Sequence, residues 1–234
     1  DIPAEKLHNE TGVQTGTHQA DTLIVGAFNT ADGSIRLINI PRDSMVDVYK
    51  LDAMYRYAYT ERGQIATQYS FGDGGAISST YTMDAVSRLL MGVPIYRYVT
   101  MSLSGIERAT DLVGGVELEI DEDFTDLDRH MKEGATLTLN GRQATLYCRQ
   151  RDTRVGDSNL ARMRRQMRFC DAFLSVMKRK VKENPAFLIT FYNEMNREMI
   201  TNLTFDEAML LAKQGLGFAF TAETLKTVPG EMVE

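Results

Sequence analysis

Cysteine, histidine and long apolar runs are scarce in this sequence of 234 residues. The two cysteines, Cys148 and Cys170, form neither a metal-ligand spacing nor a C-x-x-C motif. The three histidines, His8, His18 and His130, are scattered, which argues against a histidine-based zinc site. No segment reaches the ~20 apolar residues that a membrane-spanning helix needs, and no signal peptide is present. Two interpretations of the cysteines stay open: small buried apolar side chains, or a disulfide suited to an exported protein.

Positive charge is also in the minority. The 26 lysines and arginines face 32 aspartates and glutamates, so the formal net charge is −6. This balance argues against a protein whose whole surface binds nucleic acid, but it allows a local basic site because salt screens charges beyond roughly 10 Å. The length and the 43% hydrophobic content suffice for a core without disulfide or metal, so we predict one domain over residues 1–234. Because the chain begins at Asp1 without a methionine, we expect a trimmed or expressed fragment.

Apolar periodicity and turn residues predict an α/β fold with a mixed central β-sheet flanked by helices on both faces. Residues 21–28 are apolar at both alternating sets of positions, which predicts a strand covered on both faces. A turn at 30–33 then leads to a partner strand over 34–40. Strand, helix and strand between residues 95 and 120 suggest a crossover unit, whereas residues 49–82 show little periodicity until a helix begins. The other predicted helices share an apolar stripe or a capping signal and cover residues 82–92, 139–149, 160–182 and 204–215.

Arginine is concentrated between residues 148 and 168, where seven arginines occur without a lysine. On the helix predicted over 160–182, Arg164 and Arg168 fit a solvated flank with snorkelling side chains. Four others surround a loop that leads into the N-terminus of this helix: Arg149, Arg151, Arg162 and Arg165. Main-chain N–H groups at a helix N-terminus favour an anion, and the planar guanidinium suits bidentate contact with phosphate oxygens. The cluster therefore predicts a polyanionic ligand such as a pyrophosphate.

Two aspartates stand near the ends of predicted strands. Asp21 precedes the first strand, and Asp43 follows Arg42 after the break at Pro41. If both carboxylates faced the arginine cluster, they would repel a phosphate unless a cation intervened. Mg²⁺ fits this role, because proteins bind it through one or two carboxylates together with substrate phosphates. The alternative is that each aspartate is an ordinary turn or capping residue.

Five segments in order resemble motifs of the LytR-CpsA-Psr family, from about residue 19 to 215. "ADTLIVGAFN" resembles the family's S-D-T strand, and "LINIPRDSMVDV" resembles its S-I-P-R-D segment. "MGVPIYRYVTMSLSGIERATDLVGGVELEI" is similar to the long block that contains L-G-I-P-I-D-Y-Y-V and L-G-G-V-E-V-D. "LNGRQATLYCRQR" resembles L-N-G-x-Q-A-L-x-Y-x-R-x-R, and "SNLARMRRQ" resembles the segment that ends in R-x-x-R-Q. Several motifs in the same order make this resemblance specific.

The resemblance implies a single domain with a mixed α/β fold and a hydrophobic lipid pocket. Members of the family are anchored in the membrane and face outward. They act as phosphotransferases that move an anionic glycopolymer, such as teichoic acid or capsule, from a polyisoprenyl (pyro)phosphate carrier to peptidoglycan. It further implies Mg²⁺ (or Mn²⁺) as cofactor and a place at the outer face of the membrane or in the cell wall of a Gram-positive-type bacterium. The acidic net charge and the lack of a basic face predict no nucleic-acid partner. The N-terminal strand and the anchor would then be absent from this fragment.

Residue by residue, the resemblance implies a metal-binding role for Asp21. The catalytic residues would be Arg42, Asp43 and Arg162. The residues that bind the substrate phosphates would be Arg42, Arg149, Arg151, Arg162, Arg165 and Gln166.

The sequence departs from the family pattern at two positions near this site. Gln19 stands where the family has arginine, and Asn159 stands where it has aspartate; Asp152 or Asp157 are candidates to replace that carboxylate. Two alternatives to the transferase follow. One is a polyprenyl pyrophosphate phosphohydrolase that uses the same pocket, and the other is a non-catalytic binder of prenyl-linked glycopolymer.

Overall fold

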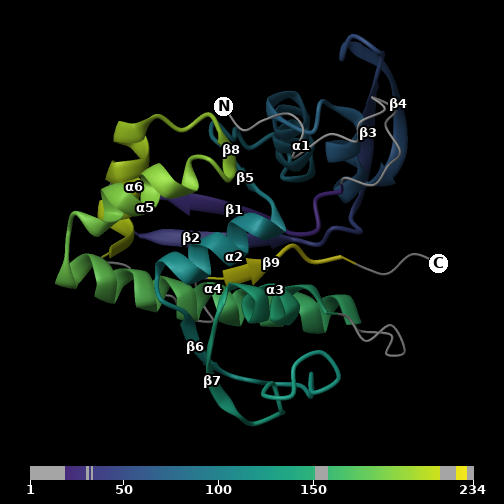
Figure 1. Ribbon diagram of the computed structural model, residues 1–234. Coiled ribbons are helices and arrows are strands. Elements are labelled where there is room, and N and C mark those ends of the chain that lie inside the picture. The colour runs from purple at the N-terminus through teal and green to yellow at the C-terminus, as the bar shows by residue number, and fades with distance from the viewer. Residues whose placement is uncertain (1–18, 30–31, 33, 151–157, 217–224, 231–234) are drawn as a thin grey trace. The chain divides into compact units, whose positions relative to one another are not determined.

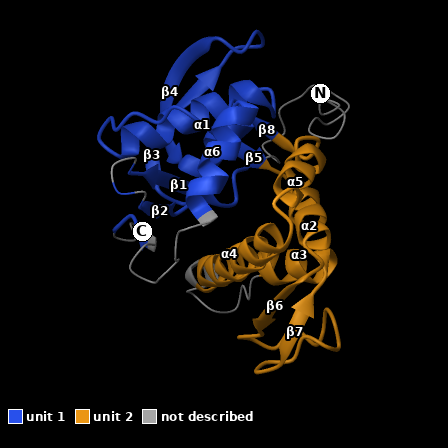
Figure 2. Ribbon diagram, turned by 90° about the vertical axis from the view of Figure 1, so that its left-hand side faces the viewer, with its two compact units in different colours: residues 1–100, 200–234 blue, residues 101–199 orange. Residues whose placement is uncertain are grey.

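The computed structural model describes residues 19–29, 32, 34–150, 158–216 and 225–230 (Figure 1). The chain divides into two compact units: residues 1–100 with 200–234 form unit 1, and residues 101–199 form unit 2 (Figure 2). The chain passes between the units in two short paired strands, β5 (Val99–Met101) and β8 (Met199–Thr201). Each unit has its own hydrophobic core. The prediction of one domain over the whole chain stays a prediction.

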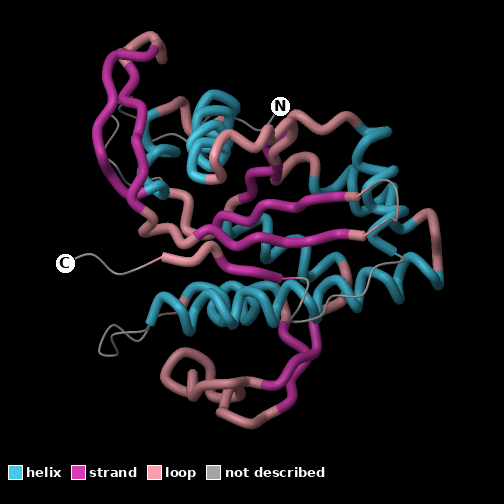
Figure 3. The backbone as a smooth tube through the Cα atoms, turned by 180° about the vertical axis from the view of Figure 1, so that it is seen from behind, coloured by secondary structure: helices cyan, strands magenta, loops and turns pink. Residues whose placement is uncertain are grey.

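Unit 1 is built on a three-stranded mixed sheet in the order β1-β2-β9 (Figure 3). Strands β1 (Leu23–Phe28) and β2 (Ile35–Ile40) form an antiparallel hairpin in which Phe28 lies opposite Ile35. Strand β9 (Leu225–Thr227) pairs with β2 in parallel and has no sequence signal that predicts it. The predicted hairpin and the mixed α/β class are thus confirmed.

Only one face of strand β1 packs against other described residues. Leu23 and Val25 pack against the core of unit 1, whereas Ile24 is 38% and Phe28 is 39% exposed. The prediction that β1 is covered on both faces is therefore wrong. An apolar run on both alternating sets shows that both faces are apolar, and it does not show what lies against each face.

A second hairpin occupies the region in which the sequence shows little periodicity. Strands β3 (Met45–Leu51) and β4 (Tyr57–Gln64) pair in antiparallel register, with an irregularity after Lys50. Val46 and Val48 point into the core of unit 1. The 3₁₀ helix η2 (Ile65–Phe71) follows directly. The sequence pattern did not predict the secondary structure of this region.

Of the helices of unit 1, α6 begins at its predicted signal, whereas the start of α1 differs from the prediction. Helix α1 (Ala76–Leu89) begins six residues earlier than the predicted start at residue 82. The chain turns after it at Gly92, whose φ of +81° glycine adopts without strain. Helix α6 (Phe205–Leu216) opens with the predicted capping box: Glu207 accepts from the Thr204 N–H at 2.9 Å, and Thr204 Oγ1 accepts from the Glu207 N–H.

Among its described residues, unit 2 contains four helices and one hairpin. The predicted helices are confirmed as α2 (Leu103–Leu112), α3 (Gly141–Arg149) and α4 (Ser158–Glu183). Its remaining elements are β6 (Val116–Glu119), β7 (Thr136–Leu139) and α5 (Phe187–Met195). The predicted crossover unit is wrong, because β6 pairs with β7 in antiparallel register and β5 pairs with β8.

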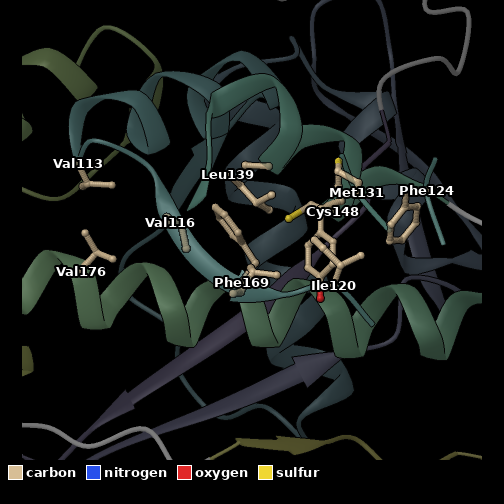
Figure 4. Packing of buried hydrophobic residues seen from close by; sticks show 12 residues of the cluster. Val113, Val116, Ile120, Phe124, Met131, Leu139, Cys148, Phe169 and Val176 are labelled. Carbon is tan, nitrogen blue, oxygen red and sulfur yellow. The ribbon is translucent and has the colours of Figure 1, made fainter. Parts of the chain in front are cut away.

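The core of unit 2 forms where α3 and the β6–β7 hairpin pack on α4. Figure 4 shows Phe169, from α4, in the middle of this cluster. Helix α3 can approach α2 closely because position 141 is glycine: a Cβ there would lie 2.4 Å from the Glu107 carbonyl oxygen. Among the described residues, no helix combines the length and apolarity that crossing a membrane requires. The 26-residue α4 has the length, but charged residues occur along it.

Candidate functional site

Arg42 stands on a tight turn at the end of β2. The turn is closed by the Ser44 N–H, which donates to the Pro41 carbonyl at 3.0 Å. Ala66 joins this turn to the segment before β1, because its N–H donates to the Arg42 carbonyl and its carbonyl accepts from the Ala20 N–H, both at 3.1 Å. Residues that are 22 positions apart in the sequence are thereby held side by side.

The Arg42 side chain is fixed by the residues that this arrangement brings near it. One terminal nitrogen donates to Asp21 and the other to the side-chain carbonyl of Gln19. The Asp43 carboxylate lies 3.8 Å from Nε. The side chain is only 14% exposed, while those of Asp21 and Asp43 are 59% and 43% exposed. A guanidinium has five N–H groups; the hydrogen bonds to Asp21 and Gln19 use two of them, and Nε faces Asp43.

Gln19 has a structural role that the sequence comparison with the family did not reveal. Its side-chain oxygen accepts a hydrogen bond from Arg42, which the arginine expected at this position could not do. The departure at residue 19 therefore replaces a second cation by an acceptor that orients the first.

Asp21 has the chemistry that a hard divalent cation needs. Carboxylate oxygens are preferred ligands of Mg²⁺, and Asp21 is more than half exposed on the edge of the Arg42 turn. No group of three or more His, Cys, Asp or Glu side chains in the described ranges forms a closed metal site. The donor set fits the open mode of binding, in which one or two carboxylates share the ion with phosphate oxygens.

In unit 2, Arg165 and Gln166 cap the C-terminus of α3. The last carbonyls of a helix have no partner within the helix. Here Arg165 Nε donates to the Tyr147 carbonyl at 3.2 Å, and its terminal nitrogen donates to the carbonyl of Gln150. Gln166 Nε2 donates to the Cys148 carbonyl at 3.1 Å. The R-Q pair of α4 thus fixes the end of α3, where Arg149 is the last residue.

Arg165 is buried, with an exposure of 1%. Its charge is balanced by Glu122, whose carboxylate lies 2.6 Å from Nη1, and its guanidinium lies 5.3 Å from the centroid of the Phe124 ring. The hydrogen bonds from Arg165, on α4, to the Tyr147 and Gln150 carbonyls hold α3 and α4 together. Glu122 carries no sequence signal that marks it as the partner of Arg165.

The other arginines of the predicted site differ in exposure. Arg149 is exposed and makes no side-chain hydrogen bond or ion pair with another described residue. Arg162 is buried in the second turn of α4, with an exposure of 5%. Arg151, like Asp152 and Asp157, lies outside the described residues.

The two arginines assigned to the solvated flank of α4 are both exposed. Arg168 is more than a solvated side chain, because it pairs with Asp121 at 3.3 Å and donates to the Glu119 carbonyl. Arg164 has no such contact with a described residue.

The Tyr147 phenol and the thiols of Cys148 and Cys170 stay uncharged near neutral pH because their pKa values are raised. Burial raises the pKa of the Tyr147 phenol, and the Asp121 carboxylate raises it further. Burial also raises the pKa of the Cys148 thiol, and that of Cys170 to about 11. Both cysteines are free, and Cys148 lies in the core of unit 2. The charge near the end of α3 therefore comes from arginines and acidic side chains.

The structure brings the predicted residues together in two sets. Asp21, Arg42 and Asp43 form one set in unit 1, with Gln19 added. The other set belongs to unit 2: Arg165 and Gln166 contact the end of α3, where Arg149 is the last residue, and Arg162 lies on the same helix as Arg165, α4.

Comparison with known proteins identifies the class to which this fold and these motifs belong. A model of the LytR_cpsA_psr family matches residues 7–233, nearly the whole chain. The protein therefore belongs to the LytR-CpsA-Psr family.

The individual relatives compared below are at most 30% identical to this chain in sequence. The polyisoprenyl-teichoic acid–peptidoglycan teichoic acid transferase TagU of Halalkalibacterium halodurans is 30% identical over 140 residues, which cover 58% of this chain and 40% of that protein. The transferase of the same name from Bacillus mycoides is 26% identical over 230 residues, which cover 95% of this chain and 66% of that protein. The crystal structure of B. subtilis TagV matches with a TM-score of 0.68 and 24% identity, over 89% of this chain and 75% of that chain. This match confirms the fold class, and the chain spans 40% to 66% of the length of the two TagU proteins.

Proposed function

We propose that this chain is the catalytic part of a phosphotransferase that moves an anionic glycopolymer from a polyisoprenyl (pyro)phosphate carrier to peptidoglycan during cell-wall assembly. Membership of the family and two relatives named as teichoic acid transferases support this proposal. The observation that carries it is the state of Arg42. Its side chain is held at the end of a strand by hydrogen bonds to Gln19 and Asp21 and lies beside Asp43, so the guanidinium is positioned before a ligand binds.

In this proposal the arginines bind the diphosphate and stabilise the charge that develops on it. Arg42, Arg149, Arg151 and Arg162 contact phosphate oxygens, since each guanidinium presents a planar fork to them. Asp43 belongs with Arg42 in the catalytic set because it lies beside the same guanidinium. Arg165 and Gln166 contribute by fixing the end of α3, and with it Arg149.

The reaction is an exchange of one P–O bond for another. The hydroxyl oxygen of a muramic acid residue attacks the phosphorus attached to the glycan, and its proton passes to solvent water. The bond from this phosphorus to the bridging oxygen breaks, and polyprenyl phosphate leaves with that oxygen. Positioning and charge neutralisation dominate such transfers, so arginines held in advance are the main requirement.

Mg²⁺ (or Mn²⁺) would be held by Asp21 together with phosphate oxygens. When bound, it supplies further neutralisation of the diphosphate charge. Asp21 also hydrogen-bonds Arg42, so one residue would link the metal ion to the guanidinium.

The proposal also includes a binding surface for the prenyl chain and a location at the membrane. Apolar side chains that remain exposed on β1, Ile24 and Phe28, offer a surface for a prenyl chain in a hydrophobic pocket. Because the carrier is a membrane lipid, the protein would work at the outer face of the membrane. An anchor in a longer protein would hold it there.

The test is a transfer reaction with purified protein, Mg²⁺ and a synthetic prenyl-diphosphate-linked glycan, with and without peptidoglycan fragments. Mass spectrometry follows the glycan on the acceptor and the release of prenyl phosphate. The proposal predicts release that depends on the acceptor and matches the glycan transferred. Equal release without acceptor would identify a phosphohydrolase, and retention of the lipid without turnover would identify a binder; either result would reject the transferase.

A further inference from the structure

Unit 2 contains a cavity of about 440 Å³ between the turn after α2, the β6–β7 hairpin and the second half of α4. This volume lies in the range of small-molecule sites. Val113 and Val176, at one end of the core cluster in Figure 4, supply apolar surface. The polar wall is formed by Gly114, Glu117, Thr138, Ser175, Arg179 and Lys180.

Within unit 2, the cavity is far from Arg162, one of the arginines proposed to bind the diphosphate. Arg162 and Lys180 are 18 positions apart on the same continuous helix, α4. At a rise of ~1.5 Å per residue, this corresponds to about 27 Å along the helix axis. A ligand in the cavity would thus be a separate contact from a diphosphate at Arg162.

The charges of the cavity have no partners of their own in the described part of the chain. Arg179, Lys180 and Glu117 form no ion pair or side-chain hydrogen bond with another described residue. Opposite charges that line one cavity attract each other, yet here no nitrogen and oxygen come within pairing distance. Lys180 is placed beside the positive-φ Gly114: its Nζ would lie 3.7 Å from a Cβ at that position.

Two hydroxyl side chains, Thr138 and Ser175, also line the cavity. Thr138 lies directly opposite Glu117 in the β6–β7 register, so the two side chains stand on the same face of the hairpin. Ser175 is exposed on α4, one helical turn before Arg179. The cavity therefore offers two cations for an anion, and a carboxylate with two hydroxyls for hydrogen-bonding groups next to it.

The geometry points to a binding site for a phosphate group with neighbouring hydroxyls, such as one polyol-phosphate or sugar-phosphate repeat of an anionic polymer. Arg179 and Lys180 bind the phosphate, and Glu117 accepts from the hydroxyls. This inference rests on the proposed function: the site would hold a repeat unit of the glycopolymer at a distance from the reacting diphosphate.

The helix dipole offers a simpler reason for cations in this part of α4, since positive side chains are favourable near a helix C-terminus. Lys182 separates the two explanations. It lies in the last turn of α4 and is exposed, but it does not line the cavity. Lys182→Gln therefore removes one such cation without changing the cavity wall.

The experiment measures binding to the purified chain by calorimetry, without prenyl lipid or Mg²⁺. The probes are a short oligo(glycerol phosphate), inorganic phosphate and a polyglutamate of similar charge. We expect Arg179→Gln/Lys180→Gln to weaken binding of the oligomer at least tenfold, Glu117→Gln to weaken it severalfold, and Lys182→Gln to change it less than twofold. Inorganic phosphate and polyglutamate should bind more weakly than the oligomer.

Several results would overturn the inference. They are no binding of the oligomer, equal weakening by Lys182→Gln and the double variant, and equal affinity for inorganic phosphate or polyglutamate. The transfer reaction described above is run separately on the unsubstituted protein. Transfer without oligomer binding rejects only the cavity site. Oligomer binding without transfer rejects the proposed function and leaves the cavity as a polyol-phosphate site.

Discussion

The side-chain amide of Gln166 on α4 donates a hydrogen bond to the main-chain carbonyl of Cys148 on α3, 3.1 Å away. This contact gives a hydrogen-bond partner to one of the carbonyls that have none within α3. Arg149, the last residue of α3, follows directly. The glutamine of the R-x-x-R-Q motif therefore acts on the backbone of a second motif, 18 positions earlier. Its effect on a ligand would pass through the position of Arg149.

The first prediction concerns Gln166→Ala. Loss of one partly buried hydrogen bond should lower the free energy of unfolding by about 1 kcal/mol. Because the end of α3 loosens, affinity for a short prenyl diphosphate should fall several-fold, measured by calorimetry. Gln143→Ala is the matched control: it removes a glutamine from the capping box at the other end of α3. It should cost similar stability and leave the affinity unchanged. Equal loss of affinity in both variants would show a general effect of destabilising α3.

Arg165→Met tests the buried cation. It leaves the carbonyls of Tyr147 and Gln150 without their donor and Glu122 without its cation. We expect a loss of roughly 3 kcal/mol in the free energy of unfolding, measured with urea. Arg164→Met, one position earlier and exposed, should change it by less than ~0.5 kcal/mol. A small effect of Arg165→Met would contradict the role given to Arg165 in holding α3 and α4 together.

Arg42→Lys tests the catalytic role of the guanidinium. Lysine keeps the charge but loses the planar fork, so we expect the transfer rate to fall on the order of 10²–10³-fold. Stability should change by less than ~1 kcal/mol, because the partners of Arg42 are largely exposed. Arg62→Lys, in an exposed pair with Asp47, should leave the rate unchanged. A rate for Arg42→Lys within a few-fold of the unsubstituted protein would refute the role.

Asp21→Asn tests the metal proposal through binding. Asparagine keeps an oxygen that accepts from Arg42 but removes the negative charge. We expect Mg²⁺ affinity in the presence of prenyl diphosphate to weaken at least tenfold in calorimetry. Asp47→Asn, an exposed aspartate on β3, should have no effect. Unchanged Mg²⁺ affinity in Asp21→Asn would remove Asp21 from the metal site.

Glu207 predicts a defined acid dependence of stability. The hydrogen bond from Arg97, aided by the Thr204 N–H, lowers the pKa of Glu207 from 4.5 to about 2. A depressed pKa contributes stability above the unfolded value, and this contribution is lost as the pH falls from about 4.5 toward 2. Glu207→Gln should therefore be less stable than the unsubstituted protein near neutral pH, and this difference should shrink as the pH falls from about 4.5 through about 2. A constant difference in urea midpoint across this range would contradict the assignment.

Local patterns in the sequence were enough to find the elements that local physics determines. The apolar stripe over residues 160–182 corresponds to α4, and Thr204 with Glu207 marks the start of α6. The pairing of short strands was not accessible in this way. Strand β6 pairs with β7 rather than through a crossover, because pairing depends on partners that a local window does not contain.

In the candidate site, too, residue types and motifs could be read from the sequence, whereas contacts that depend on the fold could not. Arg42, Asp43 and the R-x-x-R-Q segment could be found by residue type and motif. The acceptors of Arg165 could not, because they are main-chain carbonyls of another helix and carry no side-chain signature. Gln19 was visible as a departure from the family pattern, but its contact with Arg42 required the fold around Ala66.

The central claim is that arginines from distant parts of the chain bind one diphosphate. A double-mutant cycle on Arg42→Ala and Arg149→Ala, read as affinity for a short prenyl diphosphate in the presence of Mg²⁺, tests it most directly. We predict that each single variant weakens binding at least tenfold and that the two effects are coupled by ~1 kcal/mol or more. Unchanged affinity in either single variant, or two effects that simply add, would contradict the account.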